Sequence, residues 1–132
     1  MASRPESFYR DTVRAGYRAP YFRRIAELVA GGEIALETLA DAPVPDDEVD
    51  ALLRTLPGVG PYAAANIMMT LGRNSRLILD SWTRPTYARL ANKRGVPADA
   101  TIVKRFARYG AHAGLAFWLY VTSDWITEPD PG

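Results

Sequence analysis

Apolar side chains recur at helical spacing along this chain. Between Pro20 and Gly31, for example, Phe22, Ile25 and Val29 fall on one face of a helix, which is typical of a segment that packs against a core. The stretch 115–121 is apolar nearly all round and predicts a central, buried helix. We therefore expect an all-α fold, with helices over about 3–15, 20–31, 61–71, 99–109 and 114–122, further helices that start near 46 and 81, and a short turn over 35–40.

Residues that favour helix ends support these bounds. Ser3 and Glu6 form a capping-box pattern, and Asp46 is a favourable cap for the helix that follows it. Pro61 suits the first position of a helix, and Gly72 suits the residue after its end. The sequence has no repeat, no low-complexity tract and no convincing domain boundary, so we expect a single domain over 1–132.

Two glycines join the helices predicted on either side of residues 56–60, which read Leu-Pro-Gly-Val-Gly. Gly58 can adopt a positive φ that other residues resist, and Gly60 leaves the backbone bare at the start of the next helix. Exposed amides at a helix N-terminus form an anion site that suits a phosphate, and they bind it without reading the bases. The same pattern fits an ordinary corner between two helices, so alone it leaves both interpretations open.

A lone aspartate follows a short aliphatic segment. Residues 77–79 predict an extended piece, and Asp80 comes directly before the helix expected from about residue 81. Aspartate is a preferred residue at a helix N-cap. Taken alone, the position of Asp80 therefore favours a cap over a functional carboxylate.

Charge is distributed unevenly, although the net charge is only +1. Residues 1–26 hold six Arg and two acids, residues 27–50 hold eight acids and no base, and residues 76–108 hold eight Lys or Arg and two acids. Such asymmetry can mark a face that binds a polyanion. It is also compatible with an ordinary mixed surface.

The composition excludes several kinds of site. The chain has no cysteine, which rules out disulfides, iron–sulfur clusters and zinc–thiolate sites. His112 is the only histidine and has no partner cluster, so we expect no metal site built from side chains. The longest apolar run has seven residues, too few to span a membrane, and the N-terminus lacks the apolar region of a signal peptide. We expect a cytoplasmic protein that does not associate with membranes.

In combination, these features resemble the helix-hairpin-helix–Gly/Pro/Asp (HhH-GPD) DNA glycosylase superfamily, the group of endonuclease III. The hairpin sequence, the alanine-rich helix after it and an aspartate twenty residues after Gly60 carry the resemblance, which is densest over 52–84. It implies a helical bundle with a hairpin at about 47–71 and a catalytic-type aspartate loop at 76–84. Members have a long segment before the hairpin, so the chain resembles the C-terminal portion of the fold and lacks the N-terminal part.

The resemblance implies a role for each residue of the hairpin. Gly58 and Gly60, with the amides of Val59 and Tyr62, would hold a phosphate of double-stranded DNA. A monovalent cation bound by the hairpin backbone would assist them. No other cofactor is implied.

The resemblance also places Asp80 at the catalytic aspartate of the family. Breaking an N-glycosidic bond builds positive charge on the sugar, and a nearby carboxylate can stabilise that charge or activate a water molecule. The implied activity is base excision, that is, hydrolysis of the bond to a damaged or mispaired base. The spacing of Asp80 from the hairpin reverses the preference for a simple cap.

Tyr62 decides the subclass that the resemblance implies. Bifunctional members carry a lysine at this position, and its amine attacks the sugar and forms a Schiff base. Tyrosine cannot form one, so the resemblance implies a monofunctional glycosylase without lyase activity. Judged without the resemblance, Tyr62 fits equally well an aromatic residue that packs on the neighbouring helix.

The chain departs from the family pattern after the aspartate. Many members have an arginine five residues after it, where this chain has Pro85, and Arg84 comes one position earlier. Arg84 could contact a phosphate or pair with an acid. We count it as a substrate-cleft candidate on the strength of the resemblance.

Aromatic residues supply the other cleft candidates. Tyr62 and Trp82 could line a base pocket, although a tryptophan at the position of Trp82 more commonly just packs. We expect Trp118 in the core, and Trp125 with Asp124 as a cap near the end of the chain.

Two functions of different classes remain open. One is a monofunctional DNA glycosylase that uses Asp80. The other is a non-catalytic helix-hairpin-helix module, or a truncated remnant, that grips phosphate and has no base pocket. A flipped base needs a pocket. The chain could be a truncated or minimal version of the fold, or self-association or a partner could supply the missing helices.

Overall fold

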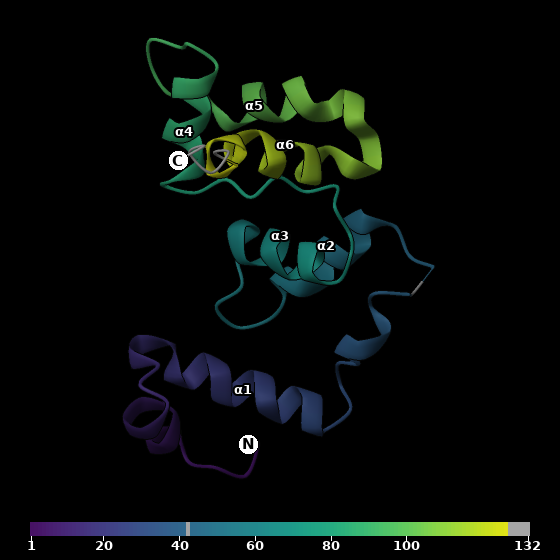
Figure 1. The fold of residues 1–132 in the computed structure, drawn as a ribbon. Helices are drawn as coiled ribbons and strands as arrows, with labels where there is room; N and C mark the ends of the chain where they lie inside the picture. Colours follow the sequence, from purple (N-terminus) through teal and green to yellow (C-terminus); the bar gives the residue numbers. More distant parts are fainter. Residues whose placement is uncertain (42, 127–132) are drawn as a thin grey trace, which may run out of the picture. The chain divides into compact units, whose positions relative to one another are not determined.

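The computed structural model describes residues 1–41 and 43–126, and within them all regular structure is helical, with no strand (Figure 1). This confirms the predicted all-α class. The chain divides into two compact units, residues 1–64 and residues 65–132, which are described separately below. The two units are distinguished by how densely their residues contact one another. The single domain expected over 1–132 stays a prediction.

The first unit consists of short helices around a small core. Its buried apolar side chains come from most of its elements and include Tyr9, Val49 and Leu53. In chain order the elements are a π-helical turn Phe8–Thr12, a 3-10 helix Gly16–Arg18, α1 Ala19–Ala30, a 3-10 helix Leu36–Thr38, α2 Asp46–Arg54 and the start of α3 Pro61–Thr70.

Two predicted helix caps in this unit are wrong, although α2 begins at Asp46 as expected. The side chain of Ser3 makes no hydrogen bond within residues 1–41 and 43–126, and Glu6 pairs with Arg10 instead of forming a capping box. Asp46 is the first residue of α2, and Pro45 occupies the cap position before it. The first helix also ends early, at Thr12 instead of residue 15.

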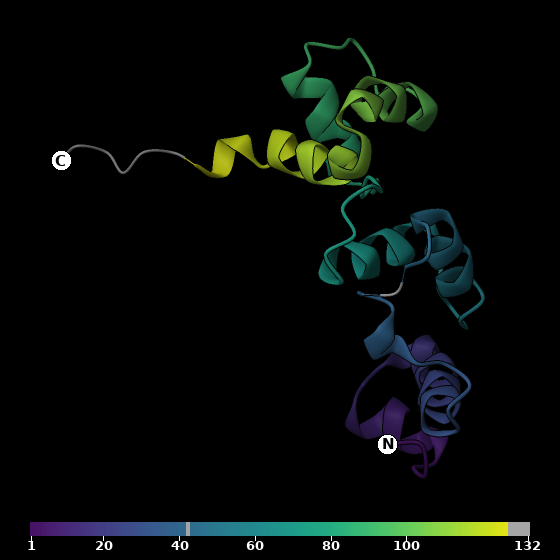
Figure 2. The same cartoon turned by 90° about the vertical axis from the view of Figure 1, so that its right-hand side faces the viewer.

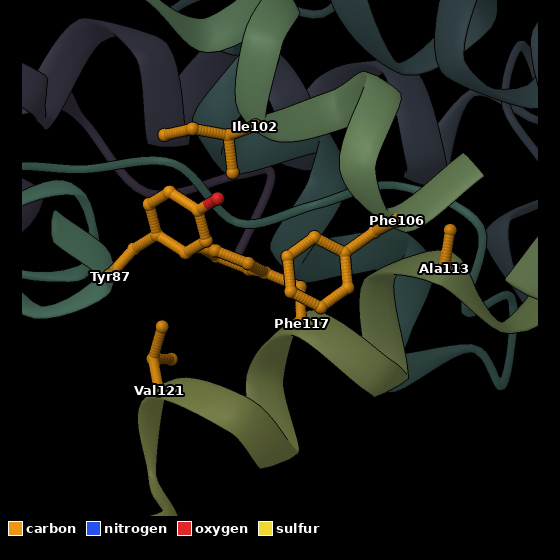
Figure 3. Close-up of a cluster of buried hydrophobic side chains, with 6 residues drawn as sticks. All are labelled: Tyr87, Ile102, Phe106, Ala113, Phe117 and Val121. Carbon is orange, nitrogen blue, oxygen red and sulfur yellow. The ribbon is translucent and has the colours of Figure 1, made fainter. Parts of the chain in front are cut away.

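The second unit has a larger aromatic core, formed where α4, α5 and α6 meet (Figures 1 and 2). Tyr87 of α4 faces Phe106 of α5 and Phe117 of α6, with Ile102 and Val121 beside them (Figure 3). Its elements are the remainder of α3, α4 Thr83–Leu90, α5 Asp99–Phe106, a 3-10 helix Ala107–His112, α6 Ala113–Val121 and a 3-10 helix Ser123–Trp125.

Helix α6 fixes the segment that leads to Asp80. The amides of Gly114 and Leu115 donate to the carbonyl of Asn74 at 2.7 and 3.2 Å. A Cβ atom on Gly114 would lie 2.0 Å from the carbonyl oxygen of Arg76, so only glycine allows this approach. Further along the segment, residues 77 and 79 pack against the aromatic core and residue 78 is buried. The backbone before Asp80 is therefore held by both hydrogen bonds and packing.

Candidate nucleic-acid interface and catalytic carboxylate

The glycine hairpin between α2 and α3 requires glycine at its first position. Gly58 has a φ of +76°, in the left-handed region that side chains disfavour. The ring of Tyr21 lies directly against it, and a Cβ atom at this position would come within 2.6 Å of the ring carbon Cδ2. The sequence predicted the positive φ, whereas the contact with Tyr21 could not be read from it.

Gly60 differs from Gly58 because its neighbourhood is open. Its φ is not in the left-handed region, and no heavy atom lies within 4 Å of the place where a Cβ would stand. Its carbonyl accepts a hydrogen bond from the amide of Ala64 at 2.9 Å, which starts α3. Its own amide donates to no group in the described part of the chain. Gly60 therefore presents a bare backbone donor at the helix N-terminus.

The amide of Val59, one of those expected to bind the phosphate, already makes a hydrogen bond within the hairpin. The amide of Val59 donates to the carbonyl of Leu56 at 3.1 Å, which closes the tight turn. Val59 is therefore a structural residue of the hairpin and does not offer its N–H to a ligand in this conformation. Tyr62, in the first turn of α3, is 50% exposed, so its ring is not a packed core residue.

Asp80 caps the turn that leads into α4, which begins at Thr83. Its Oδ1 accepts hydrogen bonds from the amides of Trp82 at 2.8 Å and Thr83 at 2.7 Å. In return, the amide of Asp80 donates to Oγ1 of Thr83 at 2.9 Å. Thr83 is fully buried, and its two hydrogen bonds with Asp80 are partly buried. The two interactions are those of a capping box, and they fix the position of the carboxylate.

The other carboxylate oxygen of Asp80 stays available. Across residues 1–41 and 43–126, Oδ2 accepts no hydrogen bond and Asp80 forms no ion pair. The side chain is half-buried, so it is open to solvent on one side. An oriented carboxylate with one free oxygen can stabilise a developing cation or accept a proton from water. The cap and the functional carboxylate, weighed above as alternatives, are thus compatible in one side chain.

Trp82 is part of an aromatic cluster that the sequence did not reveal. Its ring lies 5.5 Å from that of Trp125 and 6.3 Å from that of Trp118, measured between centroids. Trp118 packs against the core, as predicted. Trp125 is 64% exposed, and the neighbouring Asp124 pairs with Arg89 at 2.6 Å, so the expected cap is replaced by a tilted ring contact with Trp82 and an ion pair. Trp82 lies 36 and 43 residues before Trp118 and Trp125, and these separations hid the cluster from local sequence patterns.

Arg84 pairs with an acid, one of the two roles weighed for it. Its Nε and one terminal amino group donate to the two carboxylate oxygens of Asp99 at 2.7 and 2.9 Å. These hydrogen bonds lower the pKa of Asp99 below its usual value and raise the pKa of Arg84. The charge of Asp80 raises the pKa of Arg84 slightly further. A contact between Arg84 and substrate would therefore compete with an existing ion pair.

The two parts of the candidate site belong to different units. The boundary follows Ala64 within α3, so the hairpin lies in the first unit and Asp80 lies in the second. In the described residues, no group of three or more His, Cys, Asp or Glu side chains could hold a metal ion. None of the helices described is long and apolar enough to cross a membrane.

Comparison with known proteins identifies the fold. No protein-family model matches the sequence, and no curated protein matches it significantly. Among solved structures, MBOgg1 in complex with a low-affinity DNA ligand is similar, with a TM-score of 0.73 and 24% identity over 96% of this chain and 44% of that chain.

A second similar structure is the 8-oxoguanine glycosylase/lyase of Clostridium acetobutylicum, bound to double-stranded DNA with cytosine opposite 8-oxoguanine. Its TM-score is 0.70, with 23% identity over 96% of this chain and 43% of that chain. The chain thus spans less than half the length of either protein. Over that span, it shares the all-α fold of these two structures.

Proposed function

We propose that the protein is a monofunctional DNA glycosylase that hydrolyses the N-glycosidic bond of a damaged or mispaired base. The observation that carries the proposal is the carboxylate of Asp80, anchored through Oδ1 and open at Oδ2. The glycosylase fold of the similar structures supports it, as does the sequence spacing between Asp80 and the hairpin.

In the proposed reaction, Asp80 acts on the sugar side of the bond. The bond between the base and C1′ breaks, and its electron pair leaves with the base, which takes up a proton. The negative charge of Oδ2 stabilises the positive sugar, or Oδ2 accepts a proton from the water that adds to C1′. The products are a free base and an abasic site, so the step consumes one water molecule and needs no redox partner.

The hairpin is the proposed binding site for the DNA backbone. The free amide of Gly60 and the N-terminus of α3 suit a phosphate oxygen, because backbone donors there add to the helix dipole. The carbonyls of Gly58 and Val59 accept no hydrogen bond in the described residues, so they fit a monovalent cation that would help to neutralise the phosphate. Replacing potassium and sodium with a bulky organic cation at constant ionic strength should then weaken binding to duplex DNA.

Tyr62 is the reason to propose hydrolysis without strand cleavage. A phenol cannot form the Schiff base through which an amine cleaves the strand. The two lysines of the chain, Lys93 and Lys104, lie outside the hairpin sequence. The proposed chemistry therefore differs from that of the similar glycosylase/lyase, although the fold is shared over the matched span.

A base-release assay tests the proposal. Duplexes with 8-oxoguanine, uracil, mismatched thymine, hypoxanthine or an alkylated adenine would be incubated with the purified chain and analysed with and without alkali. We expect strand breaks from at least one duplex, and only after alkali. Breaks without alkali would contradict the monofunctional assignment, and release from no duplex would contradict catalysis by this chain alone.

The coverage of the similar structures favours a second candidate function. Because the chain corresponds to 43–44% of their length, the second candidate is a non-catalytic DNA-binding module that binds phosphate and has no base pocket. Salt-sensitive binding to duplex DNA without base release would support this candidate. Restored release at high protein concentration would point to self-association.

A further inference from the structure

All three tryptophans of the chain lie in one cluster in the second unit, and we call Trp82, Trp118 and Trp125 the tryptophan cluster. Trp118 is half-buried and packs against the aromatic core. Trp82 and Trp125 are 39% and 64% exposed. Two large aromatic rings, Trp82 and Trp125, are therefore exposed to solvent and rest on Trp118, which packs against the core.

The local structure holds both exposed rings in place. The amide of Trp82 donates to Oδ1 of Asp80 at 2.8 Å, so this residue is tied to the carboxylate of the proposed reaction. The short helix that carries Trp125 is attached to α4 by the ion pair between Asp124 and Arg89. The amide of Trp125 also donates to the carbonyl of Thr122 at 2.9 Å. A ligand would meet a platform that is already formed.

The charges beside the cluster favour a cation. Two arginines of α4 could repel one, but Arg84 pairs with Asp99 and Arg89 pairs with Asp124, which offsets their charges. Asp80 has no ion-pair partner among the described residues, so it leaves a net negative charge. The faces of indole rings also attract cations. Both effects favour a positively charged aromatic ring over a neutral one.

We infer that the tryptophan cluster is a stacking site for an extruded purine base that carries a positive charge, such as guanine alkylated at N7. The inference rests on the proposed function, because Asp80 next to the stack would act on the sugar of that base. An extruded base needs aromatic surface to replace the stacking it loses. Trp82 and Trp125 supply that surface, and the charge of Asp80 sets the preference.

Intrinsic fluorescence tests the inference directly, since every tryptophan of the chain belongs to the cluster. The full chain would be titrated with the free nucleosides 7-methylguanosine, which is cationic at N7, and guanosine. We expect saturable quenching by 7-methylguanosine, with a Kd at least about 5-fold lower than that of guanosine. Replacing one stacking ring, in Trp125→Leu, should raise the Kd of 7-methylguanosine by about 5-fold or more.

Matched variants control for folding and for aromatic surface in general. Tyr109→Leu removes an exposed aromatic ring outside the cluster and should leave the titration unchanged. Trp125 is well exposed, so its variant should fold, and Trp82→Leu provides an independent second test. Equal, non-saturating quenching by both nucleosides would overturn the inference. So would unchanged affinity in both tryptophan variants.

The result is independent of the proposed reaction. Nucleoside binding needs neither DNA nor hydrolysis. If the chain binds 7-methylguanosine and releases no base, the stacking site is supported and the catalytic proposal is contradicted. If the chain releases bases and does not distinguish the two nucleosides, the catalytic role is supported and the stacking site is contradicted.

Discussion

The two oxygens of the Asp80 carboxylate have different surroundings, and this makes its structural and chemical roles separable. Asparagine can accept the same two amide hydrogen bonds, so Asp80→Asn should keep the cap and remove the charge. We expect its free energy of unfolding to stay within about 0.5 kcal/mol of the unmodified chain. Asp80→Ala should lose about 1 kcal/mol with the cap. Urea denaturation measures both, and equal losses would contradict the capping role.

The two hairpin glycines should respond differently to the same substitution. Gly58→Ala places a methyl group on a left-handed residue and against the ring of Tyr21, which should cost about 1–3 kcal/mol of stability. Gly60→Ala meets open space and should fold normally, while its methyl group crowds the bare amide. We expect about 10-fold weaker binding of Gly60→Ala to duplex DNA, in line with the loss of one hydrogen bond to a charged group.

Thermal unfolding and fluorescence anisotropy distinguish these effects. If folded Gly60→Ala binds a fluorescent duplex as tightly as the unmodified chain, the phosphate-binding site lies elsewhere. A fully stable Gly58→Ala would show that Tyr21 moves away readily.

Some of these single-residue features could be predicted from the sequence. The hairpin glycines and Asp80 stand out because their chemistry follows from local order, namely a turn and a residue before a helix. The use of the Val59 amide inside the turn was missed, because the same five residues allow more than one set of hydrogen bonds. The tilted ring contact between Trp125 and Trp82 was missed because it depends on how α4 and α6 pack.

At the scale of elements, the contact between α6 and the segment before Asp80 depends on one glycine. Gly114→Ala would place its methyl carbon 2.0 Å from the carbonyl oxygen of Arg76, so α6 or the segment must move. We expect a loss of about 1–3 kcal/mol or more in the free energy of unfolding. Gly95→Ala, which meets nothing within 4 Å, is the control and should have little effect. Similar stability of the two variants would contradict the close approach.

The ion pair between α4 and the start of α5 should make stability depend on pH in acid. Hydrogen bonds from Arg84 lower the pKa of Asp99 below its usual value of 3.8. The carboxylate therefore stabilises the folded state above about pH 4, and this contribution is lost as the pH falls through the lowered pKa. Between pH 6 and pH 2, the free energy of unfolding should fall more steeply for the unmodified chain than for Asp99→Asn. Parallel curves of this free energy against pH would contradict a stabilising ion pair between Arg84 and Asp99.

Helix positions were easier to predict than helix ends. Apolar periodicity placed the helices at 20–31, 61–71 and 99–109 close to α1, α3 and α5. The ends differed because local alternatives compete, as at residues 8–13. There the amide of Val13 bonds to the carbonyl of Phe8 at 3.1 Å and ends the helix in a π-type turn.

At the scale of the whole molecule, the predicted fold class is confirmed by the structure and by its similarity to DNA glycosylases. The sequence predicted two features beyond single helices. They are the all-helical pattern and the glycine hairpin, which Asp80 follows twenty residues after Gly60. The division into two units was not foreseen, because its boundary falls inside a continuous helical pattern in α3. Charge asymmetry did not distinguish a DNA-binding face from a mixed surface.

The most direct test of the central claim compares Asp80→Asn with the unmodified chain in single-turnover base release. The assay would use the lesion duplex that reacts best, with alkali to reveal abasic sites and Asp41→Asn as a control at an exposed carboxylate. We expect Asp80→Asn to bind the duplex normally and to release base at least about 100-fold more slowly. The control should match the unmodified chain. Unchanged release by a folded Asp80→Asn would show that this carboxylate does not carry the reaction.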